Sequence, residues 1–443
     1  MGAVYYDMLG FKEEISLPTV DIGDSNMVTS PGPSPEAAKP VDFQALLLKA
    51  FTPHAPISLP DFLLGRSTLI YRMTDAVNTE GLHAVLYGDR GTGKTSIARV
   101  VAFLVQETER AMGRRCILVS CTVDDTFASI WRKIGQGILL TQRQLGFFQA
   151  ETKAIISGHL DLDSTVTTPS DARIFLEALA NPLVVVIDEF DRIRDEDTRA
   201  LMADTIKYFS DHGVRTTLIL VGVGKSLSDL LKEHLSISRN IAQIPVEPMS
   251  MSELAQIIQK GYEYTGLQFE DGLNTEMAKL SQGYPHYTHL LGLWSGRRAL
   301  EGKRTLVTFD DLNNAVPDVL QNAEGGLQLQ YELATNSTNP TAIFKQVLLA
   351  CAMAKKDSLG RFAVGAVQDP LELITGTEYT TGAYQAHLGR FCEDSRGPVL
   401  ERSGEPKSYR WRFLNPQLIP YVVLQGVRSK MIQASRVTPR QRV

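Results

Sequence analysis

The residues best suited to phosphate chemistry form the stretch GDRGTGKT, residues 88–95, which matches the pattern G-x-x-x-x-G-K-[ST]. An apolar run precedes it and the helical stretch SIARVVAFLVQ follows it, as in a phosphate-binding loop between a strand and a helix. The glycines let backbone N–H groups point at phosphate oxygens, and the helix N-terminus adds positive potential. Lys94 is expected to neutralise β- and γ-phosphate oxygens, and Thr95 to offer its hydroxyl to Mg²⁺. The predicted nucleotide contacts in this loop are Gly88, Asp89, Arg90, Gly91, Thr92, Gly93, Lys94, Thr95 and Ser96.

A pair of carboxylates supplies the second half of this chemistry. The run LVVVIDEF places Asp188 and Glu189 at the end of a stretch that reads as a buried strand. Asp188 suits the magnesium shell, and Glu189 suits the alignment and deprotonation of an attacking water. Either motif alone has a plain alternative, a chance glycine-rich turn or an ordinary strand terminus. Together and in this order they predict a site that binds and hydrolyses ATP with Mg²⁺.

The elements that position these residues follow an α/β pattern. Four apolar runs, HAVLYG, CILVSC, LVVVID and TTLILVGVG, alternate with helical stretches between residues 58 and 245, which predicts a parallel sheet covered by helices. The strand signals stop after Pro245. Residues 246–333 read as a run of helices, with caps at Ser250 or Ser252 and at Thr308. The sequence therefore predicts an α/β nucleotide-binding domain followed by a helical lid.

The two ends of the chain differ from this core. Residues 1–57 are interpreted as an N-terminal arm and a flexible linker, because residues 26–40 are rich in Pro, Ser and Gly. Residues 334–340 form a second linker. Three helices and two strands around SGEPKS follow, and this order predicts a winged helix-turn-helix over residues 341–425. Residues 426–443 are expected to form a basic tail.

Charge is distributed unevenly along the 443 residues. The net charge is −5, yet the stretch from Pro406 onward holds eight basic and no acidic residues, so residues 1–405 carry −13. No apolar run approaches the length of a membrane span, and the first residues lack a basic leader. The four cysteines show no paired C-x-x-C spacing that suggests zinc, which favours reduced core thiols. These features predict a cytoplasmic protein that does not enter a membrane.

The combination of motifs resembles the AAA+ ATPases, nearest to the origin-recognition/Cdc-type initiator clade and its bacterial relatives. The stretch PDFLLGRSTLIYRM is similar to the entry motif of that clade, and LVSCTVDDTFASIWRKI to its second strand and following helix. The resemblance covers roughly residues 58 to 425. It implies a P-loop NTPase (AAA+) fold with a helical lid and a winged helix, and it implies that Gly65 and Arg66 lie beside the adenine.

Two positions depart from the pattern of that clade, and a third matches it. Gly224, Lys225 and Ser226 stand where a polar first-sensor residue is expected, so Lys225 or Ser226 is a weak candidate for that role. His286 occupies the place of the second-sensor arginine, and the surrounding GYPHYTHLL also resembles STAND signalling ATPases, which hold nucleotide as a slow switch. Arg239 matches the place of an arginine finger that reaches a neighbouring subunit, with a surface salt bridge as the equal alternative.

The final strand, YRWRF, alternates rings with arginines. Its rings are expected to pack on the three helices while the arginines face outward, and the third helix is expected to place Ala386, Leu388 and Phe391 in the core. A recognition helix in the major groove and a wing on flanking phosphates would follow. The predicted DNA contacts are Tyr384, Gln385, His387, Arg390, Arg402, Lys407, Arg410 and Arg412.

These features predict a DNA-binding AAA+ ATPase that loads onto or remodels DNA as a homo-oligomer under the control of ATP. Two alternatives remain open. One is a STAND-like signalling switch, for example in bacterial defence against phage or plasmids, whose winged helix contacts an effector protein encoded elsewhere. The other is a transposition-regulator ATPase that forms filaments on DNA. ATP turnover that DNA stimulates and salt suppresses would favour the DNA loader or the transposition regulator over the signalling switch.

Overall fold

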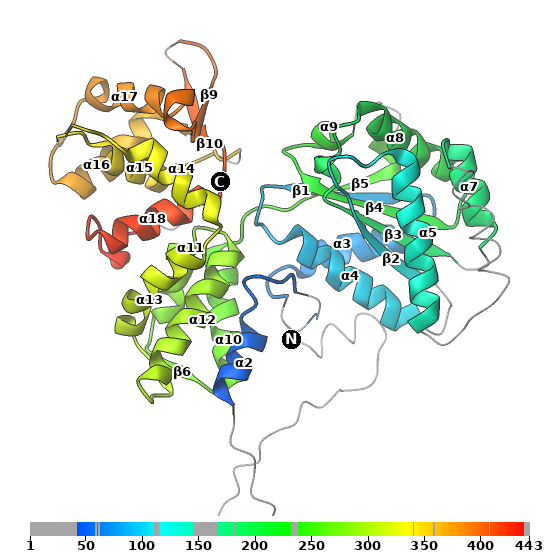
Figure 1. Cartoon of the computed structure of the whole chain (residues 1–443), viewed down its shortest axis with the longest axis horizontal. Helices are drawn as coiled ribbons and strands as arrows, with labels where there is room; N and C mark the ends of the chain where they lie inside the picture. Colours follow the sequence, from blue (N-terminus) through cyan, green and yellow to red (C-terminus); the bar gives the residue numbers. More distant parts are fainter. Residues whose placement is uncertain are drawn as a thin grey trace, which may run out of the picture. The chain divides into compact units, whose positions relative to one another are not determined.

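The structure is a computed structural model (Figure 1), and the residues it describes are 42–57, 60, 63–109, 115–144, 166–179, 182–231, 238–339, 341–357, 359–406 and 408–437. The predicted linker at 26–40 lies outside them. The described residues from Gln44 onward belong to one compact unit. Within the described ranges, no helix has the length and apolar character that a membrane span requires.

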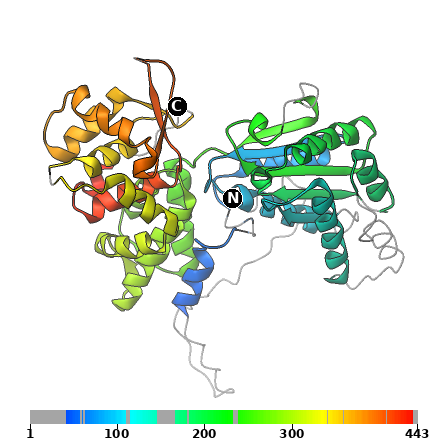
Figure 2. The same ribbon diagram turned by 45° about the horizontal axis from the view of Figure 1, so that its top comes forward.

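The central sheet contains, among the described residues, five parallel strands in the order β2-β3-β4-β1-β5 (Figure 2). The strands are β1 (His83–Gly88), β2 (Arg115–Ser120), β3 (Leu183–Asp188), β4 (Thr216–Val223) and β5 (Ile241–Pro245). The first four are the predicted apolar runs, which lack alternation because helices bury both faces of the sheet. β5 was not predicted; it pairs with β1 at the sheet edge. Since all the strands run the same way, their carboxyl ends meet at one edge, where the phosphate-binding loop and the carboxylate pair both lie.

Helices cover both faces of this sheet (Figure 1). The helices are α3 (Ser67–Asn78), α4 (Lys94–Glu109), α5 (Phe127–Gln144), α7 (Pro169–Glu177), α8 (Glu196–Asp211) and the short α9 (Leu227–Leu230). On one face, Trp131 of α5 lies edge-on to Phe175 of α7 and Phe209 of α8, with ring centroids 6.4 and 6.0 Å apart. These rings belong to the core that also contains Val185 and Leu218 of the sheet. This packing fixes the strand ends that carry the site.

A run of helices follows the sheet, as predicted. They are α10 (Met251–Thr265), α11 (Leu273–Ser281), α12 (Pro285–Glu301), α13 (Phe309–Asn322) and α14 (Gly325–Thr335), with a two-stranded parallel pair of β6 (Gln268–Phe269) and β7 (Leu306–Val307). Ser250 caps α10 in a reciprocal box with Glu253, and Thr308 caps α13 in the same way with Asp311. Both predicted caps are therefore present, with Ser250 rather than Ser252 in the capping position.

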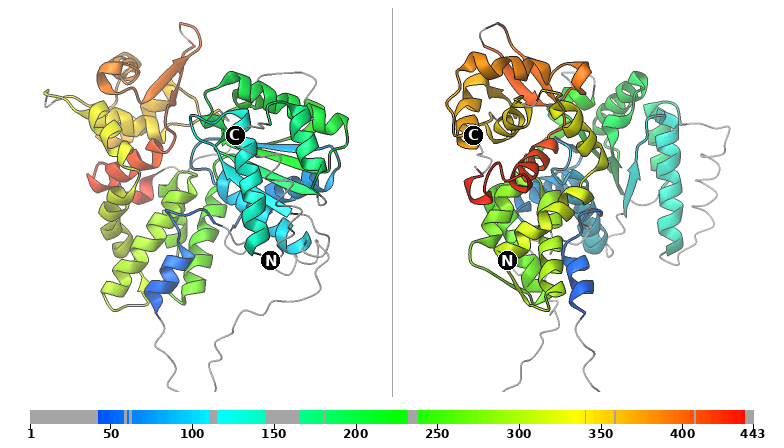
Figure 3. Two further views of the ribbon diagram at one scale, coloured as in Figure 1. Left: turned by 45° about the vertical axis from the view of Figure 1, so that its right-hand side comes forward. Right: turned by 60° about the vertical axis from the view of Figure 1, so that its left-hand side comes forward.

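The C-terminal module contains three helices and a three-stranded antiparallel sheet in the order β8-β10-β9. Its elements are α15 (Phe344–Met353), β8 (Phe362–Ala363), α16 (Gln368–Thr375), α17 (Thr381–Arg390), β9 (Leu400–Ser403) and β10 (Arg410–Phe413). The β9–β10 hairpin projects beyond the helices of the module (Figure 3). These are the elements that the predicted winged helix requires, together with a strand, β8, that the sequence did not reveal.

Two regions that were expected to be simple ends contain ordered structure. A helix, α2 (Phe43–Ala50), lies within the predicted arm and linker, and the residue after it, Phe51, is fully buried. At the other end, α18 (Leu418–Arg428) begins inside the predicted winged-helix range and extends three residues into the expected tail, and Val437 is buried after a short 3-10 turn. The 3-10 turn of the expected basic tail contacts α11, and the chain is ordered as far as Val437.

Candidate nucleotide site and basic C-terminal face

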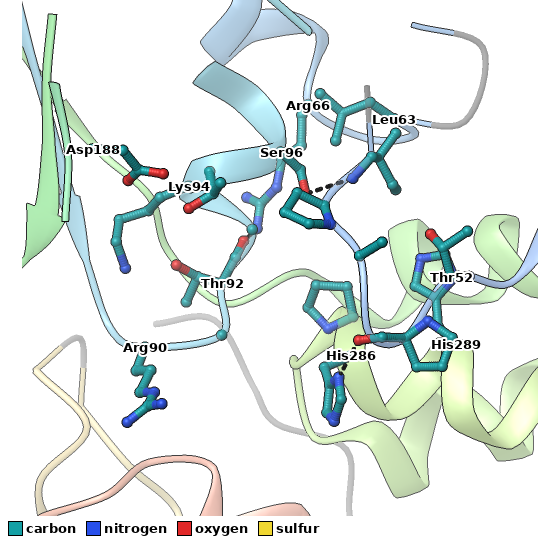
Figure 4. Close-up of a pocket in the computed structure, with 18 of the residues that line it drawn as sticks. Thr52, Leu63, Arg66, Arg90, Thr92, Lys94, Ser96, Asp188, His286 and His289 are labelled. Carbon is teal, nitrogen blue, oxygen red and sulfur yellow. Dashed lines mark hydrogen bonds between the residues drawn. The ribbon is translucent and has the colours of Figure 1, made fainter. Parts of the chain in front are cut away.

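A cavity of about 700 Å³ opens at the carboxyl edge of the sheet (Figure 4). Residues 90–96 of the phosphate-binding loop form one wall, and Asp188, Glu189 and Asp191 lie beside it. The opposite wall consists of residues 52–57 and of side chains from the helices that follow the sheet. This volume lies within the ordinary range for small-molecule sites. The predicted loop and the carboxylate pair thus share one cavity.

The loop adopts the curled backbone that the glycine pattern predicts. Gly88 has φ +154°, and a Cβ there would lie 2.3 Å from the Val246 carbonyl oxygen; Gly93 has φ +93°. Lys94 is buried, and its ammonium donates to the carbonyls of Gly88 at 3.0 Å and Asp89 at 2.7 Å. Burial lowers the pKa of Lys94 to about 8. Gly88 and Asp89 therefore anchor the lysine through their carbonyls, whereas residues 90–96 line the cavity itself.

The two carboxylates differ in their surroundings. Asp188, at the end of β3, is only 4% exposed; burial raises its pKa although the Thr95 hydroxyl and the Glu189 amide donate to it. Glu189 is exposed and has the left-handed φ of +56°. Its Oε2 accepts from Arg192 at 2.8 Å, one turn further along the 3-10 helix Phe190–Arg192. The strand end thus holds Asp188 inward and presents Glu189 at the cavity.

The position of Thr95 and Asp188 fits a magnesium ion. Mg²⁺ is usually bound by one or two carboxylates together with substrate phosphates and water. The Thr95 hydroxyl and the Asp188 carboxylate are in hydrogen-bond contact, and both line the phosphate side of the cavity. A buried carboxylate with a raised pKa is a site where a cation lowers the cost of burial. These two residues are therefore suited to a Mg²⁺ ion that accompanies a triphosphate.

Arg66 holds the phosphate-binding loop through two backbone carbonyls. Its guanidinium, 4% exposed, donates to the carbonyl oxygens of Thr92 at 3.0 Å and of Glu247 at 2.8 Å. The arginine therefore ties the phosphate-binding loop to the segment after β5, even though it also borders the cavity (Figure 4). Gly65 does not line the cavity; its φ of +72° serves the turn into α3, where Glu253 lies against it. Arg66 thus borders the cavity and Gly65 does not, and the placement of these two residues beside the adenine stays a prediction.

His286 lines the cavity from the first turn of α12 but is engaged with backbone. Its Nδ1 lies 2.9 Å from the Pro53 carbonyl oxygen, so Nδ1 must carry the proton. Burial lowers the pKa of His286, which favours the neutral ring. A neutral imidazole bound in this way does not supply the positive charge that an arginine would bring to the phosphates.

The candidate first-sensor residues do not reach the cavity. Gly222 and Val223 line it instead, at the end of β4. The Lys225 ammonium lies 3.3 Å from a Glu401 carboxylate oxygen, and Ser226 caps α9. Sequence reasoning also missed Asp191, whose Oδ1 accepts from the Val223 amide at 2.7 Å and so joins β4 to the loop after β3. Nothing in its sequence context marks this aspartate apart from its neighbours.

Two further predicted residues occupy exposed positions. The side chain of Arg239 is 74% exposed, and its guanidinium lies 3.7 Å from an Asp211 oxygen. Arg90 pairs with Glu324 of the α13–α14 turn at 2.9 Å. Both arginines are therefore held by surface ion pairs, which contribute little stability and are easily exchanged for other partners.

The basic face of the C-terminal module is smaller than predicted. Tyr384 is fully buried, and its hydroxyl donates to the Val364 carbonyl at 3.2 Å, so its assignment as an exposed DNA contact is wrong. Ala386 is exposed although it was expected in the core. His387 is half-buried, with its ring centroid 4.7 Å from that of Phe344. Gln385 and Arg390 do face outward, and Arg390 lies over the Phe344 ring as well.

The β9–β10 hairpin shows the predicted separation of rings and arginines only in part. Trp411 and Phe413 are buried, and Arg410 is exposed. Arg412, in contrast, is mostly buried and pairs with Glu401 at 2.7 Å. The Arg402 guanidinium lies 4.3 Å from the Tyr409 ring centroid while remaining exposed. Lys407 lies outside the described residues. The outward-facing candidates are therefore Gln385, Arg390, Arg402 and Arg410.

Comparison with known proteins agrees with this architecture. Residues 77–231 match the family model described as AAA domain. The chain is similar to the solved Walker-type ATPase PABY2304 of Pyrococcus abyssi, with 15% identity, coverage of 83% of this chain and 98% of the other, and a TM-score of 0.50. It is also similar to the ORC2 protein of Aeropyrum pernix in ADPNP–ADP complexes, with 16% identity, 88% and 98% coverage and a TM-score of 0.48. No curated protein sequence matches the chain. At such identities the likeness concerns the fold alone.

Proposed function

We propose that the chain, whose residues 77–231 match the AAA domain model, binds and hydrolyses Mg-ATP and uses the nucleotide to control binding of DNA by its C-terminal module. One observation carries the proposal. Lys94 and Thr95 come from one stretch of sequence and Asp188 and Glu189 from another, and all four border a single cavity of nucleotide size. A strand end with a purely structural role would not need a lysine, a hydroxyl and two carboxylates around one cavity.

The chemistry follows from the position of these groups. The loop amides and Lys94 hold the β- and γ-phosphates, and a bound Mg²⁺ would neutralise part of the charge that develops on the phosphate oxygens. Glu189 accepts a proton from the attacking water while the water oxygen bonds to the γ-phosphorus. The bond from that phosphorus to the bridging oxygen breaks, which releases ADP and inorganic phosphate. The Arg192 contact must loosen for Glu189 to orient this water.

A DNA site on the C-terminal module rests on charge and exposure. Gln385 and Arg390 lie on the outer face of α17, and Arg402 and Arg410 lie on the two strands of the hairpin. A helix with an amide and an arginine suits base edges, and arginines on a hairpin suit the flanking phosphates. The net charge of +8 from Pro406 onward adds a sequence-independent attraction to a polyanion.

A homo-oligomer is part of the proposal because Arg239 projects from the surface. Its weak contact with Asp211 leaves the guanidinium able to reach a neighbouring molecule. If Arg239 stabilises the transition state in trans, Arg239→Ala lowers turnover by about 10³-fold without a change in nucleotide affinity. Mixing Arg239→Ala with Glu189→Gln should then restore part of the activity, because some interfaces regain both residues. Equal inactivity of the mixture would place Arg239 outside the site.

The main test measures ATP hydrolysis with and without duplex DNA. We expect turnover that Lys94→Ala abolishes, that DNA stimulates, and whose stimulation declines steeply with added salt. Turnover that ignores DNA at every salt concentration would remove DNA from the proposal while leaving the ATPase intact. Absence of nucleotide binding by the unmodified protein would overturn the whole proposal.

A second candidate function is a slow signalling switch whose C-terminal module binds an effector protein. The neutral, backbone-bound His286 and the apolar Gly222–Val223 strand end favour it, because neither supplies a polar group that reads the γ-phosphate. A switch of this kind should copurify with tightly held nucleotide and fail to bind DNA. The nucleotide content of the freshly purified protein, together with a DNA gel shift, separates the two candidates.

A further inference from the structure

Residues 52–57, which we call the strap, form the wall of the cavity that faces the phosphate-binding loop (Figure 4). The strap lies before the AAA match at 77–231, at the end of the stretch 1–57 that was interpreted as an N-terminal arm and linker. Apolar side chains, including Leu63, Met249 and Ile257, border the same part of the cavity. Because the loop takes the phosphates, this apolar end is the part suited to a purine base.

Short contacts hold the strap at both ends. The Thr52 amide donates to Nδ1 of His289 at 3.3 Å, and the Pro53 carbonyl accepts from His286 at 2.9 Å, so two residues of α12 hold its beginning. At its end the Ile57 amide donates to Oγ of Ser96 at 3.1 Å, on the first turns of α4. The strap thus connects the helix that follows the phosphate-binding loop with a helix of the lid.

The residue before the strap is anchored more firmly than the strap itself. Phe51 is 0% exposed, and its ring lies edge-on to Tyr262 with centroids 5.3 Å apart. The ring occupies a notch between α10 and α12 that only glycines leave open. A Cβ at Gly261 would lie 2.3 Å from a ring atom of Phe51, and one at Gly292 would lie 2.4 Å from another. Phe51 therefore fits between the two helices with no space to spare.

We propose that Phe51 is a positioning residue that locks the strap to the lid helices, so that the base end of the nucleotide site opens only when the Phe51 ring leaves its notch. The inference rests on the proposed nucleotide binding, since it assigns a regulation of release to that same site. Phe51 itself does not touch the nucleotide. It acts through Thr52 and Pro53, whose short backbone link transmits the position of α12 to the cavity wall.

The stiffness of the strap supports this coupling. Pro53 and Pro56 fix two φ angles within six residues, which limits the ways in which the strap can move independently of its ends. A nucleotide that leaves past such a segment must displace it as a unit. The rate of release is then set by loss of the buried ring from its notch, and the rate of entry depends much less on that step.

The test measures release of a fluorescent ADP analogue from the full chain after a chase with excess ADP. We expect Phe51→Ala to increase the rate constant for release by about tenfold, because truncation of a buried phenylalanine removes most of the packing that holds the segment. Leu48→Ala is the matched control: Leu48 lies on the same helix α2, is 50% exposed, and should leave release unchanged.

Gly292→Ala approaches the same contact from the other side. The added methyl collides with the Phe51 ring and should also accelerate release, although alanine itself favours the helix. In the Phe51→Ala background the clash is gone, so Gly292→Ala should then have no further effect. General destabilisation of the fold would not make the effects of the two substitutions on release non-additive. The comparison therefore remains informative if one of the single variants folds poorly.

The outcomes separate the two proposals. If the unmodified chain binds the analogue and release is unchanged in Phe51→Ala and in Gly292→Ala, the lock is overturned while the nucleotide site stands. Additive effects of the two substitutions would also contradict the lock. If the unmodified chain binds no nucleotide at all, the proposed function fails and the lock fails with it.

Discussion

The Arg412 guanidinium lies 2.7 Å from the Glu401 carboxylate, and the same oxygen lies 3.3 Å from the Lys225 ammonium at the end of β4. Glu401 therefore connects the hairpin of the C-terminal module to the sheet that carries the nucleotide site. Glu401 also forms an ion pair with Arg412, which the sequence pattern predicted to contact DNA. Of the two arginines in YRWRF, only Arg410 faces outward without such a pair among the described residues.

DNA affinity should distinguish these two arginines. We expect Arg410→Ala and Arg390→Ala each to weaken duplex binding several-fold and to reduce the slope of log affinity against log salt by about one. Arg412→Ala should affect DNA binding much less, because its charge is already matched by Glu401. Fluorescence anisotropy over a range of salt concentrations measures both quantities.

Arg297→Ala is the control for loss of one positive charge, since Arg297 lies on α12 over the Trp294 ring. Its salt slope should equal that of the unmodified protein. If Arg412→Ala weakened binding as much as Arg410→Ala, the ion pair with Glu401 would have to open when DNA binds, and the assigned DNA face would have to be enlarged.

The role of Glu189 predicts a separation of binding from turnover. Glu189→Gln should bind ATP with unchanged affinity and lose about 10²- to 10⁴-fold in the hydrolysis rate, since the amide cannot accept the proton of the attacking water. Phosphate release and equilibrium binding of a fluorescent analogue measure the two properties. Glu196→Gln, at an exposed position on α8, is the control. Retained turnover in Glu189→Gln would assign the base to another residue.

Arg66 should affect nucleotide affinity through the phosphate-binding loop that it holds in place. Arg66→Ala leaves the Thr92 and Glu247 carbonyls without their donor, so we expect the dissociation constant for ADP to rise by about one order of magnitude or more. Arg66→Lys keeps the charge but cannot span two carbonyls in the same way, and should recover only part of the loss. Calorimetric titration gives the affinities. Full recovery with lysine would show that charge alone matters.

Asp125 should contribute strongly to stability. It is 5% exposed and accepts from the Thr122 amide at 2.6 Å, from Ser129 at 2.6 Å and from Lys133 at 2.5 Å. Removing a buried, hydrogen-bonded carboxylate that pairs with lysine leaves several donors unsatisfied, so Asp125→Ala should lower the free energy of unfolding by about 3 kcal/mol. Urea unfolding at neutral pH measures this difference. A loss below about 1 kcal/mol would contradict it, because that is the value of an exposed pair.

The same residue predicts a pH dependence. Burial opposes ionisation of Asp125, but the hydrogen bonds from Lys133, Ser129 and Thr122 outweigh it and lower its pKa to about 2. A carboxylate whose pKa is lower in the folded state stabilises the fold above its unfolded pKa, and this contribution disappears as the pH falls toward 2. The difference in stability between the unmodified protein and Asp125→Asn should therefore stay constant down to about pH 5 and shrink below about pH 4.

The parts of the fold that follow from the sequence are those with one dominant physical signal. β1 to β4 are continuous apolar runs because both faces of the sheet are covered. β5, in contrast, is the short stretch IAQIP at the sheet edge, where only Ile241 and Ile244 are fully inside, and it carries no such signal. The strap could not be predicted from the sequence for a similar reason. Its position depends on tertiary contacts of Phe51 and Thr52, and these contacts leave no local sequence pattern.

Amphipathic residues account for the errors on α17. Tyrosine can bury its ring and still satisfy its hydroxyl, as Tyr384 does with the Val364 carbonyl. Because Tyr384 was treated as a polar residue, it was wrongly predicted to lie on the exposed face. Ala386 is small enough for either environment. A count of polar and apolar residues cannot determine which face of a ten-residue helix is buried when two of its residues suit both the core and the surface. The motif residues Lys94, Thr95, Asp188 and Glu189 were more predictable, because phosphate chemistry restricts residue type and spacing together.

On the proposed function, the nucleotide bound at the α/β domain controls how tightly the C-terminal module binds DNA. The most direct measurement is the affinity of Glu189→Gln for duplex DNA at fixed salt, with saturating Mg-ATP, with Mg-ADP and without nucleotide. We predict that the ATP-bound form binds at least about tenfold more tightly than the nucleotide-free form. Equal affinity in all three states, with ATP binding verified in the same samples, would contradict the claim.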